Sequence, residues 1–346
     1  MAGGGTGGHV IPGIAVAREL RSRGHQVSFA GTEQGMESRL VPEAGFDLCK
    51  IRIGGLNRVG LRQTLTSLSY LPGATYACDR QVRRAAAVFS MGGYVAGPPV
   101  LAAIMRRVPV VVMEPNAIPG FTNRKIARFV TRALVSFQET AAFFPRGRTE
   151  VTGLPVRPEF FGIAPKSRGE VLHILITGGS QGSRTLNQAA KQSWPLFRAT
   201  GLPVRITHQT GNAGHDEIRE AFAASGIQGE VVRFISDMPA AFAQADLIVC
   251  RAGAGAVSEL AAAGKPSILV PFPFAADDHQ LHNAQAMERG GAARLVRDAD
   301  LNGEKLVETV SQIMTNLAPM GEAARRFAKP GAARRAAEVL EEVARA

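Results

Sequence analysis

The sequence has few cysteines and no long apolar run. Its three cysteines, Cys49, Cys78 and Cys250, are too few and too far apart for a disulfide framework or a zinc site. No window approaches the roughly 18 uncharged apolar residues that a membrane-spanning helix needs. The first residues show neither the basic region nor the apolar segment of a signal peptide. We therefore expect a cytoplasmic protein.

Acidic side chains are scarce in the first half of the chain. Residues 1–157 hold 20 Lys and Arg against 9 Asp and Glu, a net charge of +11, whereas residues 158–346 hold 20 of each sign. This asymmetry predicts contact with an anionic partner, a membrane surface or a phosphorylated substrate, although a solvated basic surface is the alternative. Aromatic residues make up only 6% and do not alternate with basic ones as in single-strand binders. We expect no nucleic-acid partner.

Short β-rich runs alternate with helical periodicity along the whole chain. The length of 346 residues suggests two domains at roughly 150 residues each. The alternation predicts an α/β fold of two Rossmann-like domains with parallel sheets. Helices are expected at Gly13–Arg23, at Thr122–Thr131 and over residues 331–346. The expected strands are His25–Thr32, Leu48–Ile53, Ala86–Met91, Val108–Glu114, Leu134–Phe137, Val171–Thr177, Val204–Gln209, Val231–Ile235, Leu247–Cys250, Ile268–Phe272 and Ala293–Val296.

A proline-rich stretch separates the two halves. Residues 153–168 contain three prolines, Pro155, Pro158 and Pro165, which predicts an irregular linker. We place the first domain at residues 1–157 and the second at 158–330.

Three glycine clusters stand where a strand should give way to a helix. They occupy Gly3–His9, Met91–Pro98 and Thr177–Ser183. Glycine lets a ligand approach the backbone closely, and the free amides of a helix N-terminus bind phosphate. Three such turns favour diphosphate chemistry. None is followed by the Gly-Lys-Ser/Thr of a P-loop, and no acidic residue closes the second strand as in a dinucleotide dehydrogenase.

A fourth turn, Arg251–Gly255, precedes a predicted helix that carries Glu259. A carboxylate in the first or second turn of that helix is placed to accept hydrogen bonds from ribose hydroxyls. The alternative for Glu259 is a favourable interaction with the helix dipole.

Seven motifs together resemble the MurG family, the glycosyltransferases that add N-acetylglucosamine from a UDP donor to the lipid-linked muramyl-pentapeptide of peptidoglycan synthesis. In chain order the motifs are Gly4-Gly5-Thr6-Gly7-Gly8-His9, Met91-Gly92-Gly93-Tyr94-Val95-Ala96-Gly97-Pro98, Glu114-Pro115-Asn116, Gly153-Leu154-Pro155-Val156-Arg157, Gly178-Gly179-Ser180-Gln181-Gly182, Ser258-Glu259-Leu260 and Asp277-Asp278-His279-Gln280. The resemblance covers nearly the whole chain. It implies the GT-B architecture, in which two Rossmann-like domains face each other across a cleft and the C-terminal helix, residues 331–346, crosses back to the first.

The resemblance also implies roles for individual residues toward UDP-N-acetylglucosamine. Arg157 and Ile235 would meet uracil, Glu259 the ribose, Ser180 with Gly255 and Ala256 the diphosphate, and His279 with Gln280 the sugar. Thr6, Gly7, Gly8 and Asn116 of the first domain would also contribute to the donor site. Many relatives carry threonine in place of Ala256, and some carry glutamine in place of His279.

For the acceptor, the resemblance assigns undecaprenyl-diphosphate-muramyl-pentapeptide to the first domain. Its diphosphate would lie between the two glycine loops, at Gly4, Gly5, Gly92, Gly93 and Tyr94. His9 and Asn116 would face the attacking hydroxyl, and His9 is the candidate general base because the pKa of histidine lies near neutrality. Its alternative role is a hydrogen bond that only steadies the loop. No Asp-x-Asp motif precedes a plausible metal pocket, so we expect an inverting transfer without a metal or other cofactor.

Two features concern the membrane and the chain start. Leu61, Leu65, Leu68 and Leu71 form one helical stripe beside Arg58 and Arg62, which predicts docking on the anionic cytoplasmic face of the cell membrane, with core packing as the alternative. Only Met1 and Ala2 precede the first glycine loop, where the family has an apolar strand. We expect the native start to lie upstream and the neighbouring strands to be left with unpaired backbone groups.

Two other functions fit the same motifs less well. Another GT-B enzyme, such as a diacylglycerol glucosyltransferase, would share the donor domain but not the Met91–Pro98 loop. A non-catalytic nucleotide-sugar-binding module at the membrane would not need His9.

Overall fold

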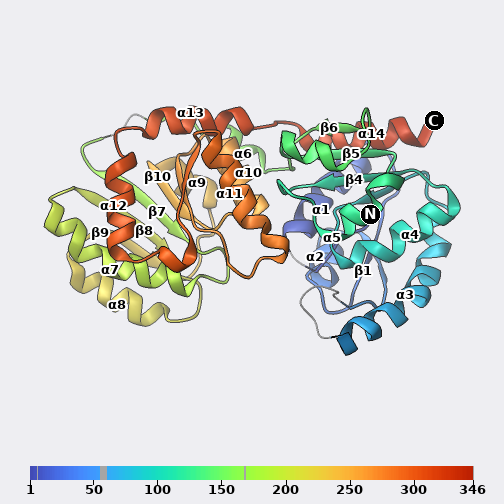
Figure 1. Cartoon of the computed structure of the whole chain (residues 1–346), viewed down its shortest axis with the longest axis horizontal. Helices are drawn as coiled ribbons and strands as arrows, with labels where there is room; N and C mark the ends of the chain where they lie inside the picture. The colour runs from blue at the N-terminus through green and yellow to red at the C-terminus, as the bar shows by residue number, and fades with distance from the viewer. Residues whose placement is uncertain (6, 55–60, 167–168, 346) are drawn as a thin grey trace. The chain divides into compact units, whose positions relative to one another are not determined.

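The chain divides into two compact units. The structure is a computed structural model that describes every residue except Thr6, 55–60, 167–168 and Ala346, and the side chains of 61–68 are also outside the described part. Unit 1 consists of Met1–Pro155 and Lys329–Ala346, and unit 2 of Val156–Ala328. Figure 1 shows both units, coloured along the chain.

Unit 1 is built on parallel strands joined by helices. Its strands are β1 (Ser28–Gly31), β2 (Asp47–Lys50), β3 (Val88–Ser90), β4 (Val110–Glu114), β5 (Arg132–Val135) and β6 (Thr149–Val151). β1 pairs with β2, and the other four lie in the order β3-β4-β5-β6, all parallel. All five residues of β4 are buried. A continuous apolar run of this kind is typical of a parallel strand covered on both faces.

Met1 and Ala2 lie between β1 and β3. Ala2 forms parallel bridges to Ala30 and Ser90. Its amide donates to the Phe89 carbonyl at 2.7 Å, and its carbonyl accepts from the Met91 amide at 2.8 Å. The expectation of unpaired neighbours is therefore wrong at this point, because two residues suffice to pair the carboxyl ends of β1 and β3.

The helices of unit 1 cover these strands. They are α1 (Gly7–Ser22), α2 (Glu37–Glu43), α3 (Leu61–Val82), α4 (Gly97–Arg106), α5 (Phe121–Ile126) and α14 (Ala332–Arg345), with 3₁₀ turns η1 (Tyr94–Ala96), η2 (Ala127–Phe129) and η3 (Gln138–Phe143). The C-terminal helix α14 packs on α1. Its Glu341 accepts hydrogen bonds from Arg23 and His25, which follow α1. Chain segments more than 300 residues apart therefore share one unit.

Unit 2 is built on a six-stranded parallel sheet in the order β12-β11-β10-β7-β8-β9. Its strands are β7 (Leu172–Thr177), β8 (Val204–Gln209), β9 (Gln228–Val232), β10 (Leu247–Cys250), β11 (Ser267–Leu269) and β12 (Ala293–Leu295). β7 lies at the centre, between β8 and β10. The chain therefore runs outward from β7 in one direction and then resumes on its other side at β10.

Helices flank this sheet on both faces. They are α6 (Pro158–Phe161), α7 (Arg184–Thr200), α8 (His215–Ser225), α9 (Met238–Gln244), α10 (Ala254–Ala263), α11 (His279–Arg289), α12 (Gly303–Ile313) and α13 (Leu317–Phe327), with 3₁₀ turns η4 (Ala276–Asp278) and η5 (Asp298–Asp300). In Figure 1, α7, α8 and α12 lie on one side, and α10 and α11 on the other. The largest fully buried side chain is Trp194 of α7. Its ring packs against Phe222 of α8, with the two ring centroids 5.1 Å apart.

The sequence predictions hold for the fold class and for most strands. The α/β class with parallel sheets is confirmed, and β8 and β10 have the predicted bounds. Several other elements differ. Strand β6 was not predicted, β9 begins three residues before the expected Val231, the expected helix at 122–131 ends at Ile126, and the supposed irregular linker contains α6. Leu61, Leu65 and Leu68 of the predicted stripe, with Arg58 and Arg62, lie outside the described residues or side chains.

Candidate functional site

Each unit places glycine-rich loops at the carboxyl ends of two central strands. In unit 1 one loop follows Ala2 and the other follows β3, and the two strand positions are neighbours. In unit 2 one loop follows β7 and the other follows β10, which are also neighbours. In both units, successive strands are added first on one side of this point and then on the other. Such a switch point is where open α/β sheets bind ligands.

The two loops of unit 1 meet through His9 and Gly93. Gly93 has φ 77°, and a Cβ added there would lie 3.3 Å from both the Gly4 carbonyl and His9 Nδ1. A Cβ on Gly5 would lie 3.1 Å from the Tyr94 ring. The structure therefore brings together the predicted acceptor residues Gly4, Gly5, Gly93 and Tyr94 with His9. Thr6 lies outside the described residues, and Gly7 and Gly8 open α1.

Two of the loop amides predicted to meet a diphosphate already have partners. The Gly5 amide donates to Glu37 Oε2 at 2.8 Å, and the Gly92 amide donates to Ser90 Oγ at 3.1 Å. These amides fix the loops within unit 1. The predicted anion contacts of Gly5 and Gly92 therefore do not use free backbone donors in this structure.

Asn116 is held by the buried carboxylate of Glu114. One oxygen of Glu114 accepts from the Asn116 backbone amide at 3.0 Å and from its Nδ2 at 3.1 Å. The other accepts from Gly120 N at 3.1 Å and Asn123 Nδ2 at 2.9 Å. Burial raises the pKa of Glu114, and these four hydrogen bonds oppose the shift. The motif match pointed to Asn116 but gave no role to Glu114, which fixes its orientation.

In unit 2, Gln209 ties the loop after β7 to the segment that contains Ile235. Its Nε2 donates to Thr177 Oγ1 at 3.0 Å and to the Gly179 carbonyl at 2.9 Å, while its Oε1 accepts from the Ile235 amide at 2.7 Å. Gln209 is 1% exposed. Ser180 follows this anchor and is exposed. Sequence reasoning assigned Ser180 and Ile235 to the donor but missed the residue that connects them.

Glu259 lies in the second turn of α10, whose first-turn amides follow Gly253. Its side chain is 31% exposed, and its carboxylate is 3.9 Å from the guanidinium of Arg157. Burial raises the pKa of Glu259 to about 7, and the positive charge of Arg157 acts in the opposite direction. The interaction with the helix dipole fades beyond the first turn, so it is weak at Glu259, and the ribose contact stays a prediction. Gly255 and Ala256 belong to the first turn.

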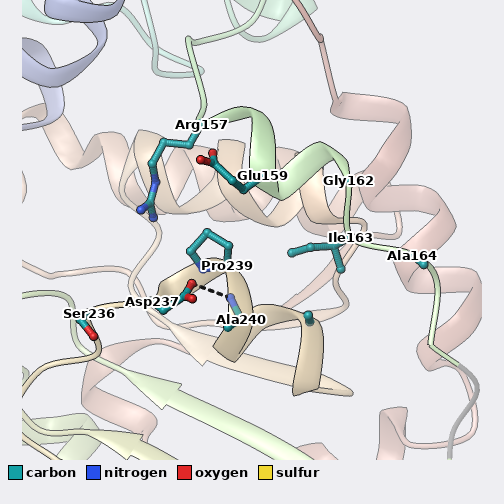
Figure 2. Close-up of a pocket in the computed structure, with 10 residues that line it drawn as sticks. Arg157, Glu159, Gly162, Ile163, Ala164, Ser236, Asp237, Pro239 and Ala240 are labelled. Atoms are coloured by element: carbon teal, nitrogen blue, oxygen red, sulfur yellow. Dashed lines mark hydrogen bonds between the residues drawn. The ribbon is translucent and has the colours of Figure 1, made fainter.

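A cavity of about 790 Å³ opens beside Arg157 in unit 2. Figure 2 shows Arg157 and Glu159 on the α6 side and Asp237 with Pro239 at the start of α9. Asp237 caps α9 by accepting from the Ala240 amide at 3.0 Å. The cavity includes Ser236, the neighbour of Ile235 in the chain. Of the two residues predicted to meet uracil, Arg157 therefore lines the cavity, and Ile235 precedes a lining residue in the chain.

The segment before α11 holds His279 and Gln280. His279 Nδ1 lies 2.6 Å from the Ala276 carbonyl, so this nitrogen carries the proton, and burial lowers the pKa of His279. Gln280 Oε1 accepts from the Phe272 amide at 3.0 Å. Asp277 and Asp278 both adopt left-handed backbone angles, with φ 51° and 50°. Two such residues in succession are costly and are typical of functional segments.

Arg251 links the two glycine loops of unit 2, and sequence reasoning assigned it no role. It follows β10, and its guanidinium donates to Ser183 Oγ, to the Val270 carbonyl and to Asp298. Ser183 caps α7 by accepting from the Leu186 amide. The arginine therefore joins the end of the β7 loop to the start of the β10 loop. Among the described residues, no group of His, Cys, Asp and Glu is arranged to hold a metal ion.

Two family models match the chain. The glycosyltransferase family 28 N-terminal domain matches residues 1–135, and the C-terminal domain of the same family matches residues 173–339. The UDP-N-acetylglucosamine–N-acetylmuramyl-(pentapeptide) pyrophosphoryl-undecaprenol N-acetylglucosamine transferase of Solibacter usitatus (strain Ellin6076) is 74% identical over 345 residues, which cover 100% of this chain and 96% of that protein. The protein of the same name from Myxococcus xanthus (strain DK1622) is 40% identical, over 98% of this chain and 91% of that protein.

A solved structure agrees with these relatives. The crystal structure of Acinetobacter baumannii MurG superposes with a TM-score of 0.83 at 33% identity, over 98% of this chain and 97% of that one. The matched part of the chain includes residues of both units. The chain therefore belongs to glycosyltransferase family 28 and, within it, to the MurG family of N-acetylglucosamine transferases.

Proposed function

We propose that this chain transfers N-acetylglucosamine from UDP-N-acetylglucosamine to the muramyl 4-hydroxyl of undecaprenyl-diphosphate-linked muramyl-pentapeptide. The observation that carries the proposal is the 74% identity, over the full chain, to a relative whose name states this transfer. The paired glycine loops of each unit support it. Two diphosphate-containing substrates call for two such sites.

Unit 2 takes the donor in this proposal. Arg157 and Ile235 contact uracil beside the cavity at α6 and α9, and the Glu259 carboxylate accepts hydrogen bonds from the ribose hydroxyls. Ser180 and the first turn of α10 meet the diphosphate, because unpaired amides at a helix N-terminus attract anions. His279 and Gln280 contact the sugar. Gly7, Gly8 and Asn116 of unit 1 remain predicted donor contacts.

Unit 1 takes the acceptor, with its diphosphate at the loops that contain Gly4, Gly5, Gly92, Gly93 and Tyr94. His9 removes the proton from the attacking hydroxyl while Asn116 orients the reacting groups. The bond from the anomeric carbon to the acceptor oxygen forms on one face as the bond to UDP breaks on the other, so the configuration inverts. Negative charge then grows on the departing diphosphate, which preorganised amides stabilise. The transfer requires no metal and no cofactor.

The test is UDP release in the presence of the lipid-linked muramyl-pentapeptide. We expect release that depends on both substrates and a product with a β linkage to the muramyl 4-oxygen, read by NMR. Replacing the acceptor with diacylglycerol is the matched control, and we expect no release. Release with diacylglycerol would favour the lipid glucosyltransferase, and binding of the donor without acceptor-dependent release would favour a non-catalytic module.

We also propose that unit 1 docks on the anionic cytoplasmic face of the cell membrane. No described helix has both the length and the apolar character needed to cross a bilayer. Exposed aromatic rings lie among cations along α5, η2 and η3. Lys125 stands 5.5 Å from the Phe121 ring, Arg128 stands 4.6 Å from the Phe129 ring, and Phe143 shares a cavity of about 470 Å³ with Arg124. Rings insert at the headgroup level while cations near an anionic surface contribute about 1 kcal/mol each. We expect no nucleic acid to bind this surface.

A further inference from the structure

The buried carboxylate of Glu37 lies directly under the first glycine loop. Glu37 is the first residue of α2 and is 0% exposed. Its Oε2 accepts from the Gly5 amide at 2.8 Å, and its Oε1 accepts from the Thr32 amide at 2.9 Å and the Thr32 hydroxyl at 2.7 Å. One side chain therefore joins the loop to the turn after β1.

The surrounding backbone leaves space for this side chain by lacking Cβ atoms. A Cβ added at Gly4 would lie 2.5 Å from Glu37 Cδ, and one at Gly31 would lie 2.5 Å from Glu37 Cγ. A Cβ at Gly35 would collide with the carboxylate oxygens. The carboxylate is therefore enclosed on three sides by backbone, and the position suits Glu37 in one conformation.

The hydrogen bonds require the carboxylate to be charged. Thr32 Oγ1 accepts from the Gly35 amide at 3.2 Å, so its own proton is directed at Glu37. All three donors then point at oxygens that must act as acceptors, which a carboxylate does and a protonated acid does only in part. Burial alone would raise the pKa of Glu37, but the hydrogen bonds from Thr32 and Gly5 outweigh it and hold the pKa below its ordinary value.

The position of Gly5 affects the rest of the site. Gly5 lies two residues before α1 and four before His9, and a Cβ added to Gly5 would lie 3.1 Å from the Tyr94 ring. A glycine-rich loop has no side chains with which to hold its own shape, and glycine loses more conformational freedom on ordering than any other residue. The order of this loop must therefore come from a neighbour.

We infer that Glu37 is a positioning residue of the transfer reaction: its carboxylate holds the first glycine loop in the conformation that receives the acceptor diphosphate and sets His9. Glu37 touches no reacting atom. The inference rests on the proposed function, because that function makes the loop an acceptor site.

A positioning role of Glu37 and a purely electrostatic effect of its charge predict opposite changes in acceptor binding. A negative charge beneath a diphosphate repels it, so neutralising Glu37 would tighten acceptor binding if charge were its main effect. A positioning role predicts the reverse, since Glu37→Gln keeps the size but offers one acceptor atom where two are needed. Gln cannot accept from Gly5 and from Thr32 at once.

The experiment compares Glu37→Gln with Thr32→Val. The second variant removes one hydrogen bond from the other carboxylate oxygen and leaves the Gly5 contact in place. With Glu37→Gln we expect the KM for lipid-linked acceptor to rise about tenfold and kcat to fall, while the affinity for UDP-N-acetylglucosamine stays within about twofold. With Thr32→Val, both constants stay within about twofold. Hydrogen exchange of a peptide covering residues 3–9 should be faster in Glu37→Gln than in Thr32→Val.

The inference is overturned if the acceptor KM falls or stays unchanged in Glu37→Gln, or if both variants change it equally. Should Glu37→Gln not fold, Gly35→Ala replaces it, because an added methyl displaces the carboxylate and keeps its charge; an unchanged acceptor KM there has the same meaning. Failure of the proposed function would show separately, as absence of acceptor-dependent UDP release in the unaltered protein.

Discussion

Donor affinity should depend on pH through Glu259. Burial raises the pKa of this carboxyl to about 7, so it ionises within the range in which the protein can be studied. In the proposed site the carboxylate accepts hydrogen bonds from ribose hydroxyls. A hydrogen bond to a charged group contributes about 1.5–3 kcal/mol, against about 0.5–1.5 kcal/mol for a neutral one. Loss of the charge should therefore weaken donor binding about tenfold.

The expected size over a practical pH range follows from the fraction ionised. About nine tenths of a group with this pKa is charged at pH 8 and about one tenth at pH 6. Weighting the two forms by their affinities gives a decrease of about fivefold in affinity for UDP-N-acetylglucosamine from pH 8 to pH 6. The ligand itself does not titrate here, because both phosphates of its diphosphate are esterified or bridged. Isothermal titration calorimetry at fixed ionic strength measures the effect.

Two variants make the assignment specific. Glu259→Gln should bind the donor more weakly at pH 8 and show no such slope. Arg157→Gln removes the cation that lies 3.9 Å away and opposes the shift in the pKa of Glu259, so the midpoint of the slope should move to higher pH. Equal affinity of the unaltered protein at pH 6 and pH 8, or an equal slope in Glu259→Gln, would refute the reasoning.

The same pKa predicts that the stability of the unliganded protein falls as the pH rises, whereas its donor affinity rises. Because the folded pKa of Glu259 lies above its ordinary value of 4.5, the folded chain binds more protons than the unfolded chain between about pH 4.5 and 7. Its contribution to the free energy of unfolding therefore decreases as the pH rises through that window. Without ligand, Glu259→Gln should raise the Tm at pH 8 and not at pH 4.5. A lower Tm at pH 8 would mean that the carboxylate stabilises the unliganded fold.

Three further predictions concern the remaining parts of the site. His9→Ala should lower kcat by about 10²–10⁴ if His9 is the base and leave donor affinity unchanged, and a variant with more than half the normal turnover would exclude His9 from the mechanism. Gln209→Leu should weaken binding of UDP more than binding of uridine, because the loop after β7 and the Ile235 segment lose their fixed spacing. Equal losses of affinity in calorimetry would assign Gln209 to packing alone. Sedimentation with vesicles should require anionic lipid, weaken with salt and decrease for Phe129→Ser but not for the exposed Phe234→Ser of unit 2; equal decreases would place the docking surface elsewhere.

Short apolar runs identified most of the strands because parallel strands are buried on both faces. β10, for example, reads Leu247-Ile248-Val249-Cys250 and is fully buried, so its bounds follow from composition alone. Two edge strands, β6 and β9, were harder to place. β9 begins with Gln228, Gly229 and Glu230, three exposed residues that pair through the backbone. The apolar run that suggested a strand to Ile235 ends instead in an exposed Phe234 and an amide that donates to Gln209.

The candidate site was predicted from compact local motifs. Glycine turns and the residues that follow them, such as Ser180 and Glu259, lie within a few positions of one another in the chain, so a motif can pick them out as predicted ligand contacts. The residues that hold these loops in place do not belong to any local sequence motif. Glu37 contacts a residue 32 positions away, and Arg251 reaches Ser183 across 68 positions. A single sequence offers no signal for pairs of this kind, because neither partner belongs to a local pattern.

These supports share a physical cause. A loop that lets a diphosphate approach its backbone has to omit side chains, and it thereby loses the groups that would hold its conformation. The first glycine loop is instead held by Glu37 and the loop after β7 by Gln209, both buried side chains from other elements. Buried Glu114 holds the segment that contains Asn116, and the partly buried Arg251 ties the turn after β10 to Ser183. A buried polar group without its partner is costly, so these contacts resist opening. Substitutions at such positions should therefore change substrate affinity and turnover although none of the four side chains is proposed to touch a substrate.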